Sequence, residues 1–146
     1  KEDNFLFPAV KSAGYSRRIK TFFGSGFAIA GNAGEFLDPI FSSGVTIALK
    51  SGSMAANLIH QELSGNQVSW QTEYVNPLLK GIRVFEAFVQ AWYNEDLIKI
   101  FFNPDQQTPI RIRISSILAG YAWDETNLLT QHTERRIKAL AEACSL

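Results

Sequence analysis

The feature that most constrains this chain is a glycine-rich loop between a short apolar run and a long helix-forming stretch. The loop and the stretch after it, 31–52, read GNAGEFLDPIFSSGVTIALKSG and directly follow the apolar run 27–30. A short apolar run between glycines predicts a strand buried on both faces. Ser42 or Ser43 is then expected to cap a helix that runs to about Leu63. This order of elements predicts a backbone shaped to lie against a ligand.

The start of that helix is the part best suited to hold a ligand. The first free N–H groups of a helix carry partial positive charge, and here they belong to Ser43, Gly44 and Val45. They are expected just beyond the carboxyl end of the predicted strand, where ligands dock in open α/β folds. A glycine in the first turn lets a flat or anionic group approach the backbone. An ordinary strand–loop–helix connection is the alternative, and the spacing alone would favour it.

Small residues gather on one side of the predicted helix. Such a face lets a helix come close to a sheet or to another helix, and tight packing alone explains it equally well. A glycine in mid-helix costs about 1 kcal/mol relative to alanine, so Gly52 is expected to have a packing reason. The small residues are Gly44, Ala48, Gly52 (or Ser51), Ala55 and Ala56.

The rest of the chain is helical in pattern, because apolar residues recur at intervals of three and four. The expected helices cover 69–92, 95–102, 109–121 and a last segment, capped by Asp124 or Thr126, that ends near Ala143. Residues 24–26 are expected to form a turn, 15–23 a half-solvated strand, and 1–14 stay unassigned. The predicted fold class is mainly α with a small β portion (α+β).

Composition excludes several classes of function. The chain has 14 Lys and Arg against 14 Asp and Glu, so no basic surplus is available to neutralise the phosphates of a nucleic acid. No apolar run is long enough to span a bilayer, and no signal peptide is visible, so no membrane partner is expected. Cys144 cannot form an internal disulfide and favours a reducing, cytoplasmic setting. The chain does not begin with Met, and we expect a fragment of a longer protein.

Few side chains suggest a metal centre or an anion site. His60 and His132 lie far apart in the sequence, and neither has a partner at metal-ligand spacing, so no metal is expected. Arg17, Arg18 and Lys20 form a small basic cluster. We expect that cluster to be a solvated face.

The run 26–52, GFAIAGNAGEFLDPIFSSGVTIALKSG, resembles the second FAD-binding motif of flavin monooxygenase-type proteins. Among these it is most similar to the flavin-dependent halogenases. The family pattern is a strand, Gly-Asp or Gly-Asn, a short loop, Asp-Pro, and Ser-Ser/Thr-Gly at the start of a small-residue helix. Two later runs, AWYNEDLIKIFFNP (91–104) and SSILAG (115–120), are similar to the helical C-terminal region of halogenases of the phenol and pyrrole type.

The resemblance implies an FAD site made by eight positions. Gly31 and Asn32 match the pair that approaches the ribityl–pyrophosphate part of FAD. Asp38 and Pro39 match the loop that shapes the flavin-ring site. The remaining positions match the helix start whose N–H groups face the isoalloxazine ring, and the second and third of them also match the halide site of halogenases: Ser42, Ser43, Gly44 and Val45.

Two departures from the family limit what the resemblance implies. Tryptophan halogenases carry a Glu just before Ser-Ser/Thr-Gly, whereas this chain has Phe41. The difference favours the phenol or pyrrole branch, or a member that does not halogenate. The first FAD motif and the catalytic lysine of halogenases are absent from these residues, and Lys50 is expected to be solvated. The catalytic residues are therefore unknown.

The implied function is that of an FAD-dependent oxidoreductase, halogenase-like or monooxygenase-like, with a small-molecule substrate of phenol or pyrrole type and halide as a further partner. Residues 1–65 would be the C-terminal part of its FAD-binding domain, and 66–146 its C-terminal helical region. The N-terminal Rossmann half of the same protein would complete the site, so the fragment alone is expected to be inactive. Two alternatives stay open: a non-enzymatic helical interaction module and a flavin reductase of isoprenoid lipids.

Overall fold

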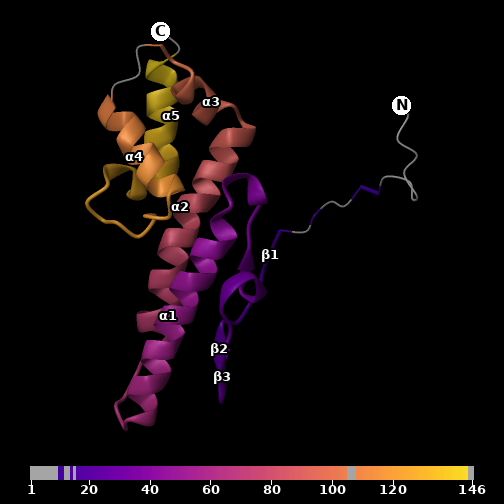
Figure 1. The fold of residues 1–146 in the computed structure, drawn as a ribbon, viewed down its shortest axis with the longest axis vertical. Helices are drawn as coiled ribbons and strands as arrows, with labels where there is room; N and C mark the ends of the chain where they lie inside the picture. The colour runs from indigo at the N-terminus through magenta and orange to yellow at the C-terminus, as the bar shows by residue number, and fades with distance from the viewer. Residues whose placement is uncertain (1–9, 12–13, 15, 105–107, 145–146) are drawn as a thin grey trace, which may run out of the picture.

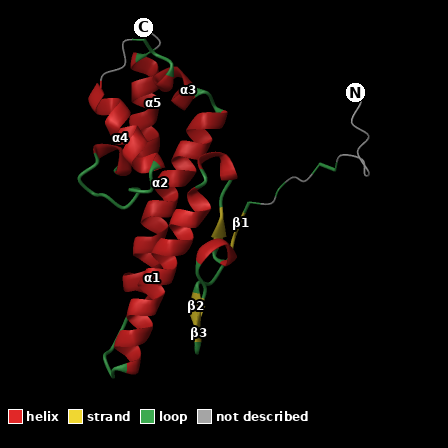
Figure 2. Ribbon diagram, in the orientation of Figure 1, coloured by secondary structure: helices red, strands yellow, loops and turns green. Residues whose placement is uncertain are grey.

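The computed structural model describes residues 10–11, 14, 16–104 and 108–144, and most of them are helical (Figure 1). Two long helices run side by side, α1 (Ser43–Leu63) and α2 (Asn76–Tyr93). Short strands lie beside them, and three shorter helices gather at one end of the pair (Figure 2). These are α3 (Asp96–Phe101), α4 (Thr108–Leu118) and α5 (Thr133–Ala143). The predicted class, mainly α with a small β portion, is confirmed.

The strands are shorter and more exposed than expected. β1 (Arg17–Arg18) pairs antiparallel with β4 (Glu35–Phe36), and β2 (Phe23–Gly24) pairs antiparallel with β3 (Phe27–Ala28). The expectation of a strand over 27–30 buried on both faces is wrong, because β3 has two residues, one partner strand and an exposed Phe27. The predicted turn lies at Ser25–Gly26 and closes the β2–β3 hairpin.

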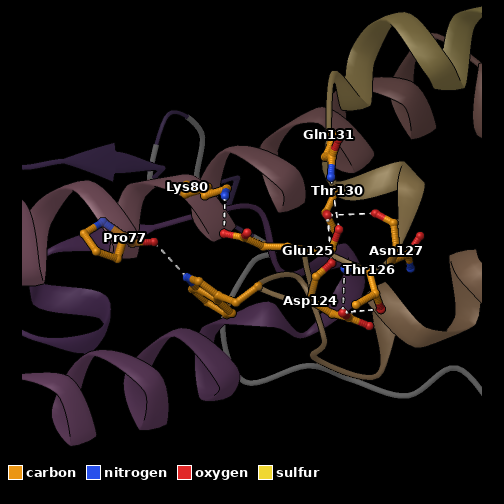
Figure 3. Close-up of polar contacts among 9 residues, drawn as sticks. Pro77, Lys80, Asp124, Glu125, Thr126, Asn127, Thr130 and Gln131 are labelled. Carbon is orange, nitrogen blue, oxygen red and sulfur yellow. Dashed lines mark hydrogen bonds and ion pairs between the residues drawn. The ribbon is translucent and has the colours of Figure 1, made fainter.

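Other predicted boundaries shifted for identifiable reasons. The helix expected over 69–92 consists of a π-helix, Trp70–Val75, followed by α2. Pro77, which has no N–H to donate, lies where one helix type passes into the other. The last helix starts at Thr133, well after the predicted caps, because Asp124 accepts hydrogen bonds from Thr126 in a turn (Figure 3). Of the strand expected over 15–23, residue 15 lies outside the described residues. The expectation of one continuous strand is wrong for the rest, because only 17–18 (β1) and 23 (the start of β2) lie in strands.

The core is centred on α2, whose Phe85 and Phe88 are fully buried. The Trp123 ring closes it on one side: a Cβ at Gly81 would lie 2.1 Å from that ring, so only glycine fits there. Trp123 Nε1 also donates a hydrogen bond to the Pro77 carbonyl at 2.9 Å. Lys50 of α1 is exposed, and its ammonium lies 5.7 Å from the Trp123 ring centroid. Trp123 therefore joins both long helices.

Candidate functional site

The candidate site begins at the first turn of α1, where the helix has no side-chain cap. Ser42 occupies the N-cap position with φ 52° and ψ 28°, in the left-handed region, and its side chain accepts no hydrogen bond from the first turn. Its amide donates instead to the Pro39 carbonyl at 2.9 Å. The expected serine cap is therefore absent. The first-turn amides of Ser43, Gly44 and Val45 are left to other acceptors.

Ser43 carries the most unusual polar atom of the site. The residue is 3% exposed, and its Oγ is the buried side-chain oxygen without a hydrogen-bond partner among the described residues. A buried hydroxyl left in this state costs about 1–3 kcal/mol. Such a group in a folded protein requires an explanation, and a missing ligand or water is one. The side chain thus has an unused donor and acceptor at the uncapped helix start.

Asn32 and Gly44 face each other at this turn. A Cβ at Gly44 would lie 3.0 Å from Asn32 Oδ1, so the glycine makes room for the Asn32 amide. Asn32 is exposed, and its amide offers both donors and an acceptor. The fold therefore brings three of the expected site residues together: Asn32, Ser43 and Gly44.

Gly31 contacts α1 itself. Its φ is +61°, and a Cβ there would lie 3.2 Å from the Cβ of Ala48. The Gly31 amide donates to Ser51 Oγ at 2.8 Å, and Ser51 Oγ donates to the Ile47 carbonyl at 2.6 Å. Only glycine combines this backbone conformation with so close an approach. Sequence reasoning missed the role of Ser51, although a serine between Ile47 and Ala55 on one helix face was a visible signal.

Asp38 is bound within the fold. Its Oδ1 accepts a hydrogen bond from the Ile40 amide at 3.0 Å, which caps the 3₁₀ helix Pro39–Phe41. Its Oδ2 accepts one from the Tyr93 hydroxyl at 2.9 Å. Asp38 and Pro39 therefore fix the direction in which the chain enters α1, through a tie to the end of α2.

An ion pair with a buried carboxylate supports the loop that leads to α1. Glu35 on β4 is 4% exposed and pairs with Arg18 on β1, which also contacts Glu86 on α2 at 2.6 Å. Burial raises the pKa of Glu35, and the hydrogen bond from Arg18 opposes that rise. Arg17, Arg18 and Lys20 are all exposed, as expected for a solvated face, and Arg18 in addition joins two carboxylates.

The part of the chain that the structure describes contains neither a metal-ligand cluster nor a membrane-spanning helix. No group of three or more His, Cys, Asp or Glu side chains there could hold a metal ion. None of the described helices is long and apolar enough to cross a membrane. The first turn of α1 is thus the strongest candidate.

Known proteins resemble this chain over most of its length. A 1H-pyrrole-2-carbonyl-[peptidyl-carrier protein] chlorinase of Pseudomonas fluorescens is 31% identical over 138 residues, which are 93% of this chain and 30% of that protein. A flavin-dependent halogenase of Armillaria mellea is 50% identical over 56 residues, 38% of this chain and 11% of that protein. The homologues of this chain are flavin-dependent halogenases. No protein-family model matches it.

A solved structure extends the similarity to the fold. The flavoprotein/dehydrogenase of Cytophaga hutchinsonii matches with a TM-score of 0.88 and 39% identity, over 90% of this chain and 33% of that one. The chain thus spans about a third or less of the length of its relatives, which is consistent with a fragment of a larger FAD-binding fold. These homologues do not favour the helical interaction module or the isoprenoid-lipid reductase.

One residue of the flavin-halogenase-like motif has a clear local role. Phe41, the residue before Ser42, packs edge-to-face against Trp92 with 5.8 Å between ring centroids. It joins the loop before α1 to the end of α2 through apolar contact, so the position carries no charge in this chain.

Proposed function

We propose that this chain is the C-terminal part of an FAD-dependent oxidoreductase, halogenase-like or monooxygenase-like, and that the first turn of α1 holds the flavin ring. In this proposal residues 1–65 belong to the FAD-binding domain and 66–146 form a helical region that follows it. The observation that carries the proposal is the buried, unpartnered hydroxyl of Ser43 at an uncapped helix start. The flavin-dependent homologues and the flavoprotein neighbour support flavin as the ligand.

The eight expected residues would act in two groups. The amides of Ser43, Gly44 and Val45 would face the ring, and the partial positive charge of the helix start would stabilise negative charge on the reduced flavin. Asn32 would add a neutral hydrogen-bonding group beside them. The other four would hold this turn in place: Gly31, Asp38, Pro39 and Ser42.

Bound FAD would supply the redox chemistry that activates oxygen for oxygenation of a substrate or oxidation of halide. The residues of this chain would bind and orient the ring. The proposed substrate is a small molecule of phenol or pyrrole type, since two relatives are named as a chlorinase and a brominase of a carrier-bound pyrrole-2-carbonyl group. Halide is the second proposed partner. The free thiol of Cys144 fits a reducing, cytoplasmic setting, which is part of the proposal.

Flavin binding tests the proposal in two contexts. The isolated chain should be inactive and bind FAD weakly or not at all, because the remainder of the FAD site lies outside it. A fusion that carries this chain in place of the matching third of the Cytophaga flavoprotein should retain FAD. In that fusion Ser43→Ala should weaken FAD binding by about tenfold, as expected for one lost hydrogen bond. Ser53→Ala, at an exposed position of the same helix outside the site, should change it little.

Two results would contradict the proposal: tight, stoichiometric FAD binding by the isolated chain, or a folded fusion that excludes FAD. Once FAD is retained, product analysis with and without halide separates halogenation from oxygenation. The same analysis with an isoprenoid lipid as the test substrate checks for reduction.

A further inference from the structure

A cavity lies between α2 and the start of α5, and none of its lining residues belongs to the motif over 26–52. Its volume is about 510 Å³. Part of the lining is apolar and buried, since Val84 and Ala87 are each 3% exposed. We call it the α2–α5 cavity. Its charged and polar lining includes Lys80 and Arg83 on α2, and His132, Thr133, Glu134 and Arg135 at the start of α5.

Two arginines of this lining have no carboxylate partner. Arg83 and Arg135 are both exposed, and neither forms an ion pair with any residue that the structure describes. Lys80 differs, because it pairs with Glu125, which does not line the cavity (Figure 3). Glu134 brings a negative charge to the same lining. The two guanidinium groups are therefore available to an anion, with one carboxylate opposing its approach.

The start of α5 adds further hydrogen-bond donors to the cavity. His132 holds the N-cap position with φ 51° and no side-chain cap, so the first-turn amides have no side-chain acceptor there. Thr133 is 8% exposed and lines the cavity, and its hydroxyl makes no hydrogen bond with another described residue. Buried polar groups in folded proteins normally have partners, so this hydroxyl points to a group that the chain does not supply.

We propose that the α2–α5 cavity binds the phosphate group of a small phosphate ester. Each guanidinium of Arg83 and Arg135 presents a planar fork that matches two phosphate oxygens. The first-turn amides of α5 favour an anion at the same place, and the Thr133 hydroxyl can donate to it. These donors outnumber the acceptor sites of a carboxylate, which favours phosphate. The buried apolar lining favours an ester over inorganic phosphate, because it offers contact to the organic part.

Calorimetric titration of the 146-residue chain at fixed ionic strength tests the ligand class with three probes. Phenyl phosphate supplies both parts of the proposed ligand, inorganic phosphate lacks the organic part, and benzoate replaces phosphate by a carboxylate. Phenyl phosphate should bind about threefold or more tightly than inorganic phosphate, and about tenfold or more tightly than benzoate. Equal binding of the two phosphates would assign the cavity to free phosphate and overturn the ester. Equal binding of benzoate would overturn phosphate recognition.

Charge variants test whether the cavity is the binding site. Arg83→Gln and Arg135→Gln should each weaken phenyl phosphate binding by about tenfold, as expected for a lost charge-assisted hydrogen bond. Arg136→Gln is the matched control, because it removes the same charge from the same helix but does not line the cavity, and it should change binding by less than about twofold. Glu134→Gln should strengthen binding by about threefold, because it removes the opposing charge. A misfolded variant could not produce that gain.

Three results would overturn the site: no saturable binding of either phosphate, equal losses in Arg136→Gln and in the two cavity variants, or no gain in Glu134→Gln. Far-UV circular dichroism checks that each variant is folded. If the isolated chain does not fold, the same titrations are made in the fusion with the Cytophaga flavoprotein, and the same results decide. None of these readouts involves flavin. The phosphate site and the proposed flavin site can therefore fail independently.

Discussion

Two turns of this molecule treat their polar groups in opposite ways. In the turn before α5, Asp124 Oδ1 accepts hydrogen bonds from the amide and the hydroxyl of Thr126, at 2.9 and 2.6 Å (Figure 3). Asn127 Oδ1 accepts from the Leu129 amide at 3.0 Å, and the Thr130 hydroxyl contacts the Asp124 carbonyl at 2.9 Å. This turn satisfies its side chains from within.

In the first turn of α1 the side-chain polar groups are not satisfied from within the chain. Ser42 stands at the N-cap without capping, and the Ser43 hydroxyl is buried without a partner. Both turns precede a helix, and both contain short hydroxyl-bearing side chains. The turn before α5 is thus complete within this chain, whereas the first turn of α1 keeps a buried hydroxyl for which we propose a partner outside it.

The largest expected effect concerns the packing of α2 against Trp123, the residue that precedes the satisfied turn. Gly81→Ala would place a Cβ on α2 only 2.1 Å from the ring of Trp123. Overpacking of this kind should lower the free energy of unfolding by about 3 kcal/mol, measured by urea denaturation. The matched control is Gly52→Ala, which meets nothing within 4 Å and should stabilise the isolated chain by up to about 1 kcal/mol. Equal stability of Gly81→Ala and the parent would contradict this packing.

The next effect concerns a buried member of the satisfied turn. Asn127 is 4% exposed, donates to the Arg113 carbonyl at 2.9 Å and accepts from the Leu129 amide. Asn127→Ala leaves both main-chain groups without this partner and should cost about 2 kcal/mol in urea denaturation. Gln131→Ala, which removes an exposed hydrogen bond to the Glu125 carbonyl, should cost less than about 0.5 kcal/mol. A similar loss for both variants would mean that burial does not set the cost.

Ser43→Ala should act in the opposite direction. It removes a desolvated hydroxyl that makes no hydrogen bond, so the free energy of unfolding of the FAD-free chain should rise by about 1 kcal/mol. Ser51→Ala is the matched control on the same helix, because the equally buried Ser51 hydroxyl bonds to Gly31 and Ile47. That variant should be destabilised by about 1–2 kcal/mol. Loss of stability in both variants would show that Ser43 already has a partner within the chain.

The smallest expected effect is a difference in pH response between two carboxyl groups. Burial raises the pKa of Glu35 above 4.5, so its ionisation penalises the folded state, and stability recovers as the pH falls through the raised value. Hydrogen bonds from Thr126 lower the pKa of Asp124 below 3.8, so its stabilising contribution is lost as the pH falls through the lowered value. Titration of the carboxyl groups followed by NMR should find these opposite pKa shifts. The variants Glu35→Gln and Asp124→Asn assign the two carboxyl signals. Shifts of the same sign would contradict the assigned environments.

The helices were largely predictable from sequence, because their apolar spacing is local information. The predicted end of α1 at Leu63 is confirmed. The strand over 27–30 was not predictable, because burial on both faces depends on neighbours that a short apolar run does not reveal. The start of α5 was misplaced because Asp124 and Thr126, both good helix caps, satisfy each other in a turn instead.

The motif in the sequence proposes the members of the candidate site, which stay a prediction, but it does not reveal their contacts. The motif over 26–52 named the residues, but the partners that hold them lie far away in the sequence. Gly31 is bound by Ser51, twenty residues later, and Asp38 by Tyr93, fifty-five residues later. No local pattern indicates that Ser43 would be buried without a partner, since that depends on how the loop folds over the helix start.

The most direct test of the account is a crystal structure of the FAD-loaded fusion. The account predicts an atom of the flavin ring within hydrogen-bond distance of Ser43 Oγ, about 3 Å, with the amides of Gly44 and Val45 facing the ring. A structure in which protein side chains fill that corner, with no room for a flavin, would contradict it.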